Sequence, residues 1–190
     1  MRYVALLRGI NVGGKGAIRM EDLRAIFAAA GARDVATYIA SGNVIFEAPA
    51  SALPAIRKKA QAKLQRILGE KAATVYRSAS EVQAIARRDP FGGYDPVARD
   101  PFGRHKPKDK IGRYVLFFGN TPASKMRVPC TSETEACEVI GMHGLHAFVV
   151  SYRKRTGWYG FPNEWVERAL GVVSTARTWN TVAKLAALTE

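Results

Sequence analysis

The amino-acid sequence predicts an α+β fold with a ferredoxin-like N-terminal subdomain, and three observations support this prediction. Over residues 1–78, runs of strand-forming residues alternate with amphipathic helical periods in the order β-α-β-β-α-β, which is the split-βαβ layout. Residues 79–190 hold a second series of strand and helix patterns, which predicts a second α+β subdomain packed with the first. The 190 residues are 47% hydrophobic and 24% charged, as in ordinary globular domains.

Local patterns justify each element of the first subdomain. The run RYVALLRG at residues 2–9 is rich in strand formers. A helix is predicted over residues 20–31, because Leu23, Ile26 and Phe27 recur at helical spacing and Gly31 ends the pattern. The other predicted elements are strands at 34–40, 43–48 and 73–78, a tight turn at Ser41-Gly42-Asn43, and a helix at 51–69 whose apolar stripe includes Ile67.

The second subdomain begins with a helix at residues 80–88, for which Ser80 is the predicted N-cap. A long basic loop over residues 89–111 follows, and it repeats the segment Arg-Asp-Pro-Phe-Gly at 88–92 and 99–103. Two interpretations of this repeat are open: Phe91 and Phe102 fasten the loop to apolar surface, or the repeat arises by chance. The remaining elements are a strand at 113–119, a hairpin over 136–152 and helices at 161–171 and 178–188, so the second half resembles a degenerate copy of the first.

The charge distribution leaves two interpretations open. The formal net charge is +13, and two blocks, residues 51–78 and 99–127, each carry +6. Such blocks are typical of a surface that binds a polyanion. Lysine- and arginine-rich helix faces also keep proteins soluble without binding anything.

The glycine-rich segment after the first strand resembles a phosphate-binding loop without matching it. The pattern G-x-x-x-x-G-K-[ST] would place Ser or Thr at position 16, where this chain has Gly16. The next helix also begins near Met20, too far along for its N-terminus to face a bound phosphate. We therefore exclude a nucleotide-hydrolysing loop. Bare backbone and nearby donors still suit a small anion, and the residues concerned are Arg8, Asn11, Gly13, Gly14 and Lys15. The alternative is a wide turn.

Two further polar segments predict a ligand site. The turn at Ser41 and Asn43 offers polar side chains, although turn chemistry alone explains it. The segment STARTWNTVAKL offers Arg177 and Asn180, although helix capping explains its Ser and Thr residues. We expect the three segments to share one pocket for a small anionic ligand carrying phosphate or carboxylate. The sequence assigns no catalytic residue, and no metal or other cofactor is expected.

A second hypothesis is a non-enzymatic nucleic-acid-binding protein. Its contact residues would be Arg104, Lys106, Lys108, Lys110, Arg153, Lys154, Arg155 and Trp158. The base-stacking pattern of an RNA-recognition motif is not matched, because the first and third strands offer only Tyr3 and Phe46. A third possibility is a partner-binding scaffold, with Trp158, Tyr159 and the Phe91/Phe102 loop as an apolar contact.

The chain is expected to be cytoplasmic. No apolar run approaches the length of a membrane span, the apolar stretch at residues 1–10 is too short for a signal peptide, and Cys130 and Cys137 are too few for a disulfide framework. His143 and His146 have no third ligand nearby in sequence, so a metal site is not expected there. The sequence does not specify the oligomeric state.

Three segments together resemble the bacterial DUF1697 family of uncharacterised proteins. They are YVALLRGINVGGKGAIRMEDLR, VATYIASGNVIFEA and GVVSTARTWNTVAKL, and the DPF near position 90 also fits. The resemblance implies a ferredoxin-like N-terminal part and a second α+β part, and it implies no activity. The signature positions it assigns are Arg8, Gly9, Asn11, Gly13, Gly14, Lys15, Ser41, Gly42, Asn43, Arg177, Trp179, Asn180 and Lys184. The chain departs from the pattern at Ala17, at Thr178 and in the basic insert around 99–110.

Overall fold

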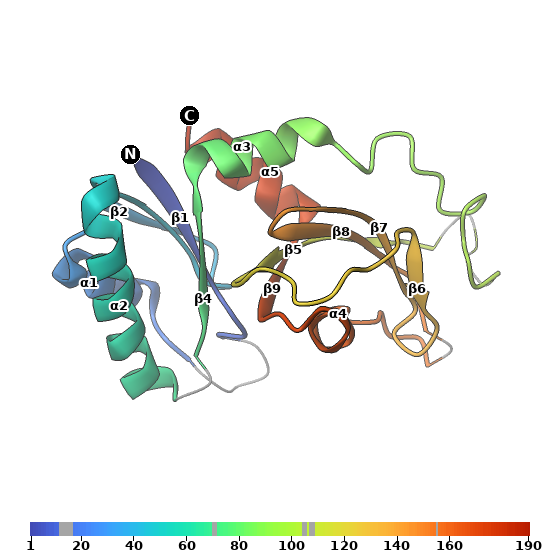
Figure 1. Ribbon diagram of the computed structural model, residues 1–190, viewed down its shortest axis with the longest axis horizontal. Coiled ribbons are helices and arrows are strands. Elements are labelled where there is room, and N and C mark those ends of the chain that lie inside the picture. The colour runs from blue at the N-terminus through green and yellow to red at the C-terminus, as the bar shows by residue number, and fades with distance from the viewer. Residues whose placement is uncertain (12–16, 70–71, 104–105, 107–108, 155) are drawn as a thin grey trace. The chain divides into compact units, whose positions relative to one another are not determined.

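The structure, a computed structural model of the 190-residue chain, describes every residue except 12–16, 70–71, 104–105, 107–108 and 155. The described residues form two antiparallel sheets and five α-helices, which confirms the α+β class (Figure 1). Packing divides the chain into two compact units, Met1–Arg87 with Ala183–Glu190, and Arg88–Val182. Within the described part of the chain, no helix combines the length and hydropathy that crossing a bilayer requires.

The first unit contains a four-stranded sheet with two of its helices packed against one face. Its elements are β1 (Arg2–Leu7), α1 (Met20–Ala30), β2 (Arg33–Tyr38), β3 (Asn43–Glu47), the 3-10 helix η1 (Ala50–Ala52), α2 (Leu53–Leu68), β4 (Thr74–Ser78) and α3 (Ala79–Arg88), whose last residue begins the second unit. The strand order is β2-β3-β1-β4, and every neighbouring pair is antiparallel. Figure 1 shows α1 and α2 together beside this sheet, and the two helices contact each other.

The core between this sheet and its helices is aromatic. The rings of Tyr3, Phe27, Phe46 and Tyr76 are buried, with centroids 5.5 to 6.5 Å apart. Side chains of a strand alternate between the two faces of a sheet. Tyr3 and Phe46 therefore point toward the helices, and neither ring can stack bases on the opposite face as an RNA-recognition motif does.

The second unit contains a five-stranded sheet. Its elements are β5 (Gly112–Phe118), β6 (Cys130–Ser132), β7 (Cys137–His143), β8 (His146–Ser151), α4 (Asn163–Leu170), β9 (Ser174–Thr178) and α5 (Trp179–Leu188), whose residues from Ala183 onward belong to the first unit. The strand order is β6-β7-β8-β5-β9, again antiparallel throughout. Helix α4 packs Val166 and Leu170 against one face of the sheet.

The two phenylalanines of the long loop both pack against other aromatic rings, which favours the first interpretation of the repeat. Phe91 is 3% exposed and contacts the rings of Phe148 and Trp179. Phe102 contacts the ring of Tyr152. Because Phe91 is buried within the second unit, it is unavailable for an apolar partner contact.

The two sheets share one internal layout. In the first sheet, β1 lies between β3 and β4, and in the second, β5 lies between β8 and β9. The pairing registers also match. Arg77 of β4 lies opposite Val4 of β1, and Arg177 of β9 lies opposite Val115 of β5. The strands β5, β7, β8 and β9 thus correspond to β1, β2, β3 and β4, and the connection from β5 to β7 contains β6 in place of a helix. The second half is a degenerate structural copy of the first.

Some elements differ from the sequence prediction. Strands β6 and β9 are not predicted, and α3 begins at Ala79 rather than Ser80. Ser78 caps α3, since its Oγ accepts the N–H of Glu81 at 3.2 Å. The division after residue 78 remains a prediction about chain organisation. By packing, the C-terminal residues belong with the first sheet, and Gln83 Nε2 donates to the carbonyl of Thr189.

Candidate ligand-binding site

The loop after β1 leaves the sheet in a fixed direction. The backbone N–H of Arg8 donates to the carbonyl of Ala73 at 2.9 Å, which extends the β1–β4 ladder by one bond. Gly9 follows at φ 60°, in the left-handed region that glycine tolerates without strain. Gly13, Gly14 and Lys15 lie outside the described residues.

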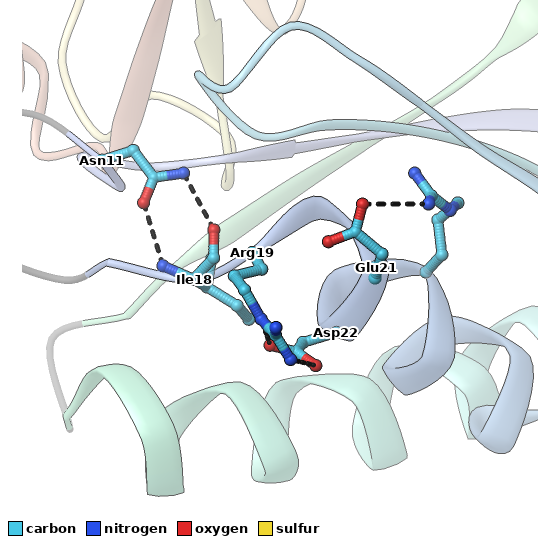
Figure 2. Close-up of polar contacts among 6 residues, drawn as sticks. Asn11, Ile18, Arg19, Glu21 and Asp22 are labelled. Atoms are coloured by element: carbon cyan, nitrogen blue, oxygen red, sulfur yellow. Dashed lines mark hydrogen bonds and ion pairs between the residues drawn. The ribbon is translucent and has the colours of Figure 1, made fainter.

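Asn11 fastens both ends of this loop. Its Nδ2 donates to the carbonyl of Ile18 at 3.1 Å and its Oδ1 accepts the N–H of Ile18 at 2.9 Å (Figure 2). Nδ2 also donates to the carbonyl of Ala40 at 2.8 Å. Asn11 itself has φ 55°, a conformation in which asparagine is one of the favoured non-glycine residues. The amide that the sequence suggests for a ligand is therefore engaged with the protein's own backbone.

The β2–β3 turn meets the β1 loop. The carbonyl of Gly42 accepts the N–H of Leu7 at 2.8 Å, and a Cβ at Gly42 would lie 2.6 Å from Cδ1 of Ile10. Asn43 is fully buried, and its Nδ2 donates to the carbonyl of Tyr38 and to Ser41 Oγ. Two of the three predicted segments are therefore neighbours, and Asn43 holds the turn.

A cavity of about 800 Å³ lies in the first unit beside the loop after β1. Helix α1 provides an apolar wall with Ala25, Ile26 and Ala29. Helix α2 adds Ile67, which is 47% exposed although the sequence pattern places it in the core stripe. Asn11 also lines the cavity, so the ends of the glycine-rich loop are at its wall.

The polar wall of this cavity is mainly cationic. Arg19 Nε donates to Asp22 Oδ2 at 3.0 Å, and this bond holds the pKa of the Asp22 carboxyl below its usual value (Figure 2). Lys59 and Lys63, one turn apart on α2, also line it. Both lysines are exposed, and within the described residues neither forms an ion pair. The net charge facing the cavity is positive.

The third predicted segment lies in the second unit. Arg177 is in β9 and only 6% exposed, and its Nη1 donates to Thr175 Oγ1 and to the carbonyl of Ala176, each at 2.8 Å. Burial lowers the pKa of Arg177 to about 10, so the guanidinium is still charged at neutral pH. Asn180 is in the first turn of α5 and exposed.

Arg77 is a buried residue that the sequence reasoning missed. It is 5% exposed, burial lowers its pKa, and its Nη1 donates to the carbonyl of Tyr76 at 2.7 Å. It therefore occupies in β4 the place that Arg177 occupies in β9. A signal was present. TVYRS and START both place an arginine before Ser or Thr and a helix, and Arg-Tyr-Val opens β1 and follows Gly112 in β5.

The residues of the nucleic-acid hypothesis are partly described. Trp158 is 77% exposed, and Arg153 Nε donates to the carbonyl of Gly157 at 3.0 Å within the same hairpin. Lys154 forms an ion pair with Glu135 at 2.9 Å, which offsets its charge. Arg104, Lys108 and Arg155 are outside the described residues, whereas Lys106 and Lys110 are exposed.

The cysteines and the metal-ligating side chains give no sign of a reactive site within the described residues. Both cysteines are free, and burial raises the pKa of the Cys137 thiol to about 11, which keeps it protonated and unreactive at neutral pH. Among the residues that the structure describes, no three His, Cys, Asp or Glu side chains gather as a metal site would require.

Comparison with known proteins identifies a family and a fold. The chain matches, over residues 1–145, the model of a family described as "Protein of unknown function (DUF1697)". Among solved structures it resembles that of the conserved bacterial protein SP0830 from Streptococcus pneumoniae, with a TM-score of 0.55 and 18% identity over 100% of this chain and 98% of that one. No curated protein matches. At this identity, the structural match carries the fold alone.

Proposed function

The chain belongs to the DUF1697 family, described as proteins of unknown function, and we propose that it binds a small anionic ligand in the cavity of its first unit. The observation that carries this proposal is a cavity with an apolar wall on α1 and two lysines on α2 that form no ion pair among the described residues. Its volume of about 800 Å³ is within the range of small-molecule sites. The ligand would place an apolar body on α1 and a phosphate or carboxylate near the lysines.

The glycine-rich loop is proposed to complete the site. Gly13, Gly14 and Lys15 stand between Asn11 and Ala17, which both line the cavity. Successive backbone N–H groups in such a loop form concave anion sites, and a lysine adds a charge-assisted hydrogen bond. The role we give Asn11 is to hold the ends of the loop, while Arg8, Ser41 and Asn43 support it from β1 and the β2–β3 turn.

Variants on α2 test the proposal. We expect a screen of anionic metabolites by thermal shift to yield a compound that raises the melting temperature of the parent protein. Lys59→Gln combined with Lys63→Gln should weaken its binding by roughly a hundredfold, because each lysine contributes a charge-assisted bond worth about tenfold.

The matched control is Lys58→Gln, which removes one exposed charge from the same helix outside the cavity. It should leave the affinity of the compound nearly unchanged. A stabilising compound whose affinity is the same in the parent protein, the Lys59/Lys63 double variant and Lys15→Gln would place binding elsewhere and contradict the proposal.

We also infer that the first unit is a ferredoxin-like sandwich. The inference is supported by the antiparallel strand order β4-β1-β3-β2 and by α1 and α2 lying on the same face. In that layout the α1–α2 layer is separate from the sheet face that RNA-recognition motifs use, so a cavity along α1 and α2 is a different kind of site.

Binding of single-stranded nucleic acid is a second candidate function. Trp158 is 77% exposed in the hairpin that Arg153 and Tyr159 close, and Phe161, two residues after Tyr159, is 62% exposed. Exposed aromatic rings beside cations suit base stacking with backbone attraction. Affinity for an oligonucleotide should fall steeply as salt rises and should drop on Trp158→Ala. Absence of any binding at low salt would remove this candidate.

A further inference from the structure

A second cavity, of about 350 Å³, lies in the second unit. It lies where the N-terminal end of β5, the C-terminal end of β9 and the start of α5 come together, and Tyr159 of the neighbouring hairpin contributes to its wall. All of its lining residues belong to one compact unit. Its volume is near the lower end of the range for small-molecule sites.

Three aromatic side chains line this cavity, and their surroundings hold them in place. Tyr159 Oη donates to the carbonyl of Lys110 at 2.6 Å. Trp179 packs edge-on against Phe91, with ring centroids 5.3 Å apart. Tyr114 lies so close to Gly112 that a Cβ there would be 2.4 Å from its ring. A rigid aromatic wall favours a flat ring as ligand.

The charges of this cavity are cationic. Lys110 and Arg113 are exposed and line it, and no acidic residue is found among its described lining residues. Asn180 adds an exposed amide from the first turn of α5. A ligand with an anionic group would therefore meet two cations and an amide donor.

The corresponding corner of the first unit is built differently. There, Glu81 closes the start of α3, accepting both the N–H and the hydroxyl of Ser78 at 2.7 and 2.8 Å. At the matching position α5 has Thr181, whose N–H donates to Thr178 Oγ1 at 3.4 Å. The carboxylate that closes one copy is thus replaced by a neutral residue in the copy that has the cavity.

We propose that this second cavity binds a flat aromatic ring that carries an anionic group. The ring lies against Tyr114, Tyr159 and Trp179, and the anionic group is held by Lys110, Arg113 and Asn180. Nucleoside monophosphates and aromatic carboxylates both have this chemistry. The proposal does not depend on the cavity of the first unit.

The test uses the full chain and four probes. Adenosine 5′-monophosphate and indole-3-carboxylate represent the two sources, and adenosine and indole are their uncharged counterparts. Binding is followed by two-dimensional NMR of the three tryptophan indole N–H groups, with the signal of Trp179 assigned through Trp179→Phe. We expect at least one anion to shift the Trp179 signal at millimolar concentration and its uncharged counterpart to bind at least about tenfold more weakly.

Surface variants separate a specific site from general attraction. Arg113→Gln should weaken binding about tenfold, and Asn180→Asp should weaken it while leaving the fold intact, because an acid is favourable in the first turn of a helix. Lys125→Gln removes an exposed charge outside the cavity and should change nothing. If neither anion shifts Trp179, or if Lys125→Gln weakens binding as much as Arg113→Gln, the proposal is wrong.

Discussion

At the scale of single residues, the buried arginines are the most informative feature. Arg77 and Arg177 stand at matching register positions, are nearly inaccessible, and each donates to the carbonyl of its preceding residue. Burying a guanidinium is unfavourable unless its donors are satisfied. Each arginine donates to the carbonyl of the preceding residue in its own strand. Because both copies bury an arginine in this way, we interpret the buried cation as a feature of the repeated fold and not of one unit alone.

Asn11 gives the first residue-scale prediction. Asn11→Ala should lower the free energy of unfolding by about 1–3 kcal/mol, because it removes three hydrogen bonds and leaves alanine in a left-handed conformation. Urea unfolding of the purified variant measures the change.

Two further variants separate the causes. Asn11→Gly removes the side-chain amide but tolerates the positive φ without strain. Asn11→Asp keeps an oxygen that accepts the N–H of Ile18 and removes the two hydrogen bonds that Nδ2 donates. If the amide is what fastens the loop, both variants should be less stable than the parent. Parent-like stability of Asn11→Asp would show that the two bonds donated by Nδ2, to the carbonyls of Ile18 and Ala40, contribute little.

At the scale of elements, the start of α3 gives the next prediction. Ser78→Ala should destabilise the protein by about 1 kcal/mol, since Ser78 and Glu81 satisfy each other's backbone donors. Ser80→Ala should have a smaller effect, because within the described residues the hydroxyl of Ser80 contacts the Ser78 hydroxyl and accepts no backbone N–H. Thermal unfolding of the two variants compares them, and a larger effect at Ser80 would restore the cap that the sequence suggests.

The element patterns explain what sequence could and could not predict. Helices α1 and α2 are predictable because Leu23, Ile26 and Phe27, or Ile56 and Leu64, recur at helical spacing. Strand β9 is not, because START has no apolar alternation: its buried positions are taken by Ser174, Thr175 and Arg177. The strand is defined by its pairing with β5, and Ser174 is bound by Asn163 and Glu167 of α4. That pairing is long-range information.

The candidate sites were predictable only in part. The sequence points to Asn11 and to the turn at Asn43, and the structure brings these segments together but engages both amides with backbone. The sequence does not point to Lys59 and Lys63, because nothing in a helical pattern tells which exposed turn borders a cavity. The cavity forms between residues of α1 and α2, whereas the hydrophobic periodicity of a sequence describes the faces of a single helix.

At the scale of the whole molecule, the repeat shows which features were added to a shared layout. The 800 Å³ cavity depends on α1, and the second unit has β6 in that place. The 350 Å³ cavity depends on Trp179 and Asn180, where the first unit has Ala79 and Ser80. Each copy therefore carries its candidate site at a point where the copies differ.

Alkaline stability is a whole-molecule prediction, because acids in both units contribute. Burial raises the pKa of Cys137 from 9.0 to about 11, and burial raises the pKa of Tyr76 and of Tyr152 from 10.0 to about 12. The unfolded chain loses these protons at lower pH than the folded chain, so it binds fewer protons above about pH 9. The free energy of unfolding should therefore be steady near neutrality and fall as pH rises toward 10 and beyond.

A variant of Cys137 can show how much of this loss of stability comes from the buried thiol. Between neutral pH and pH 10, the titration of Cys137 should lower the free energy of unfolding by about 1 kcal/mol, because its pKa is raised from 9.0 to about 11. Measurements stop at about pH 10, because the lowered pKa of Arg177 acts in the opposite direction above that value. In urea unfolding, Cys137→Ala should lose about 1 kcal/mol less stability than the parent over this interval, whereas Cys130→Ala, at a partly exposed position of β6, should behave as the parent does. An identical loss in the parent and in Cys137→Ala would mean that the buried thiol does not govern the alkaline limit of the fold.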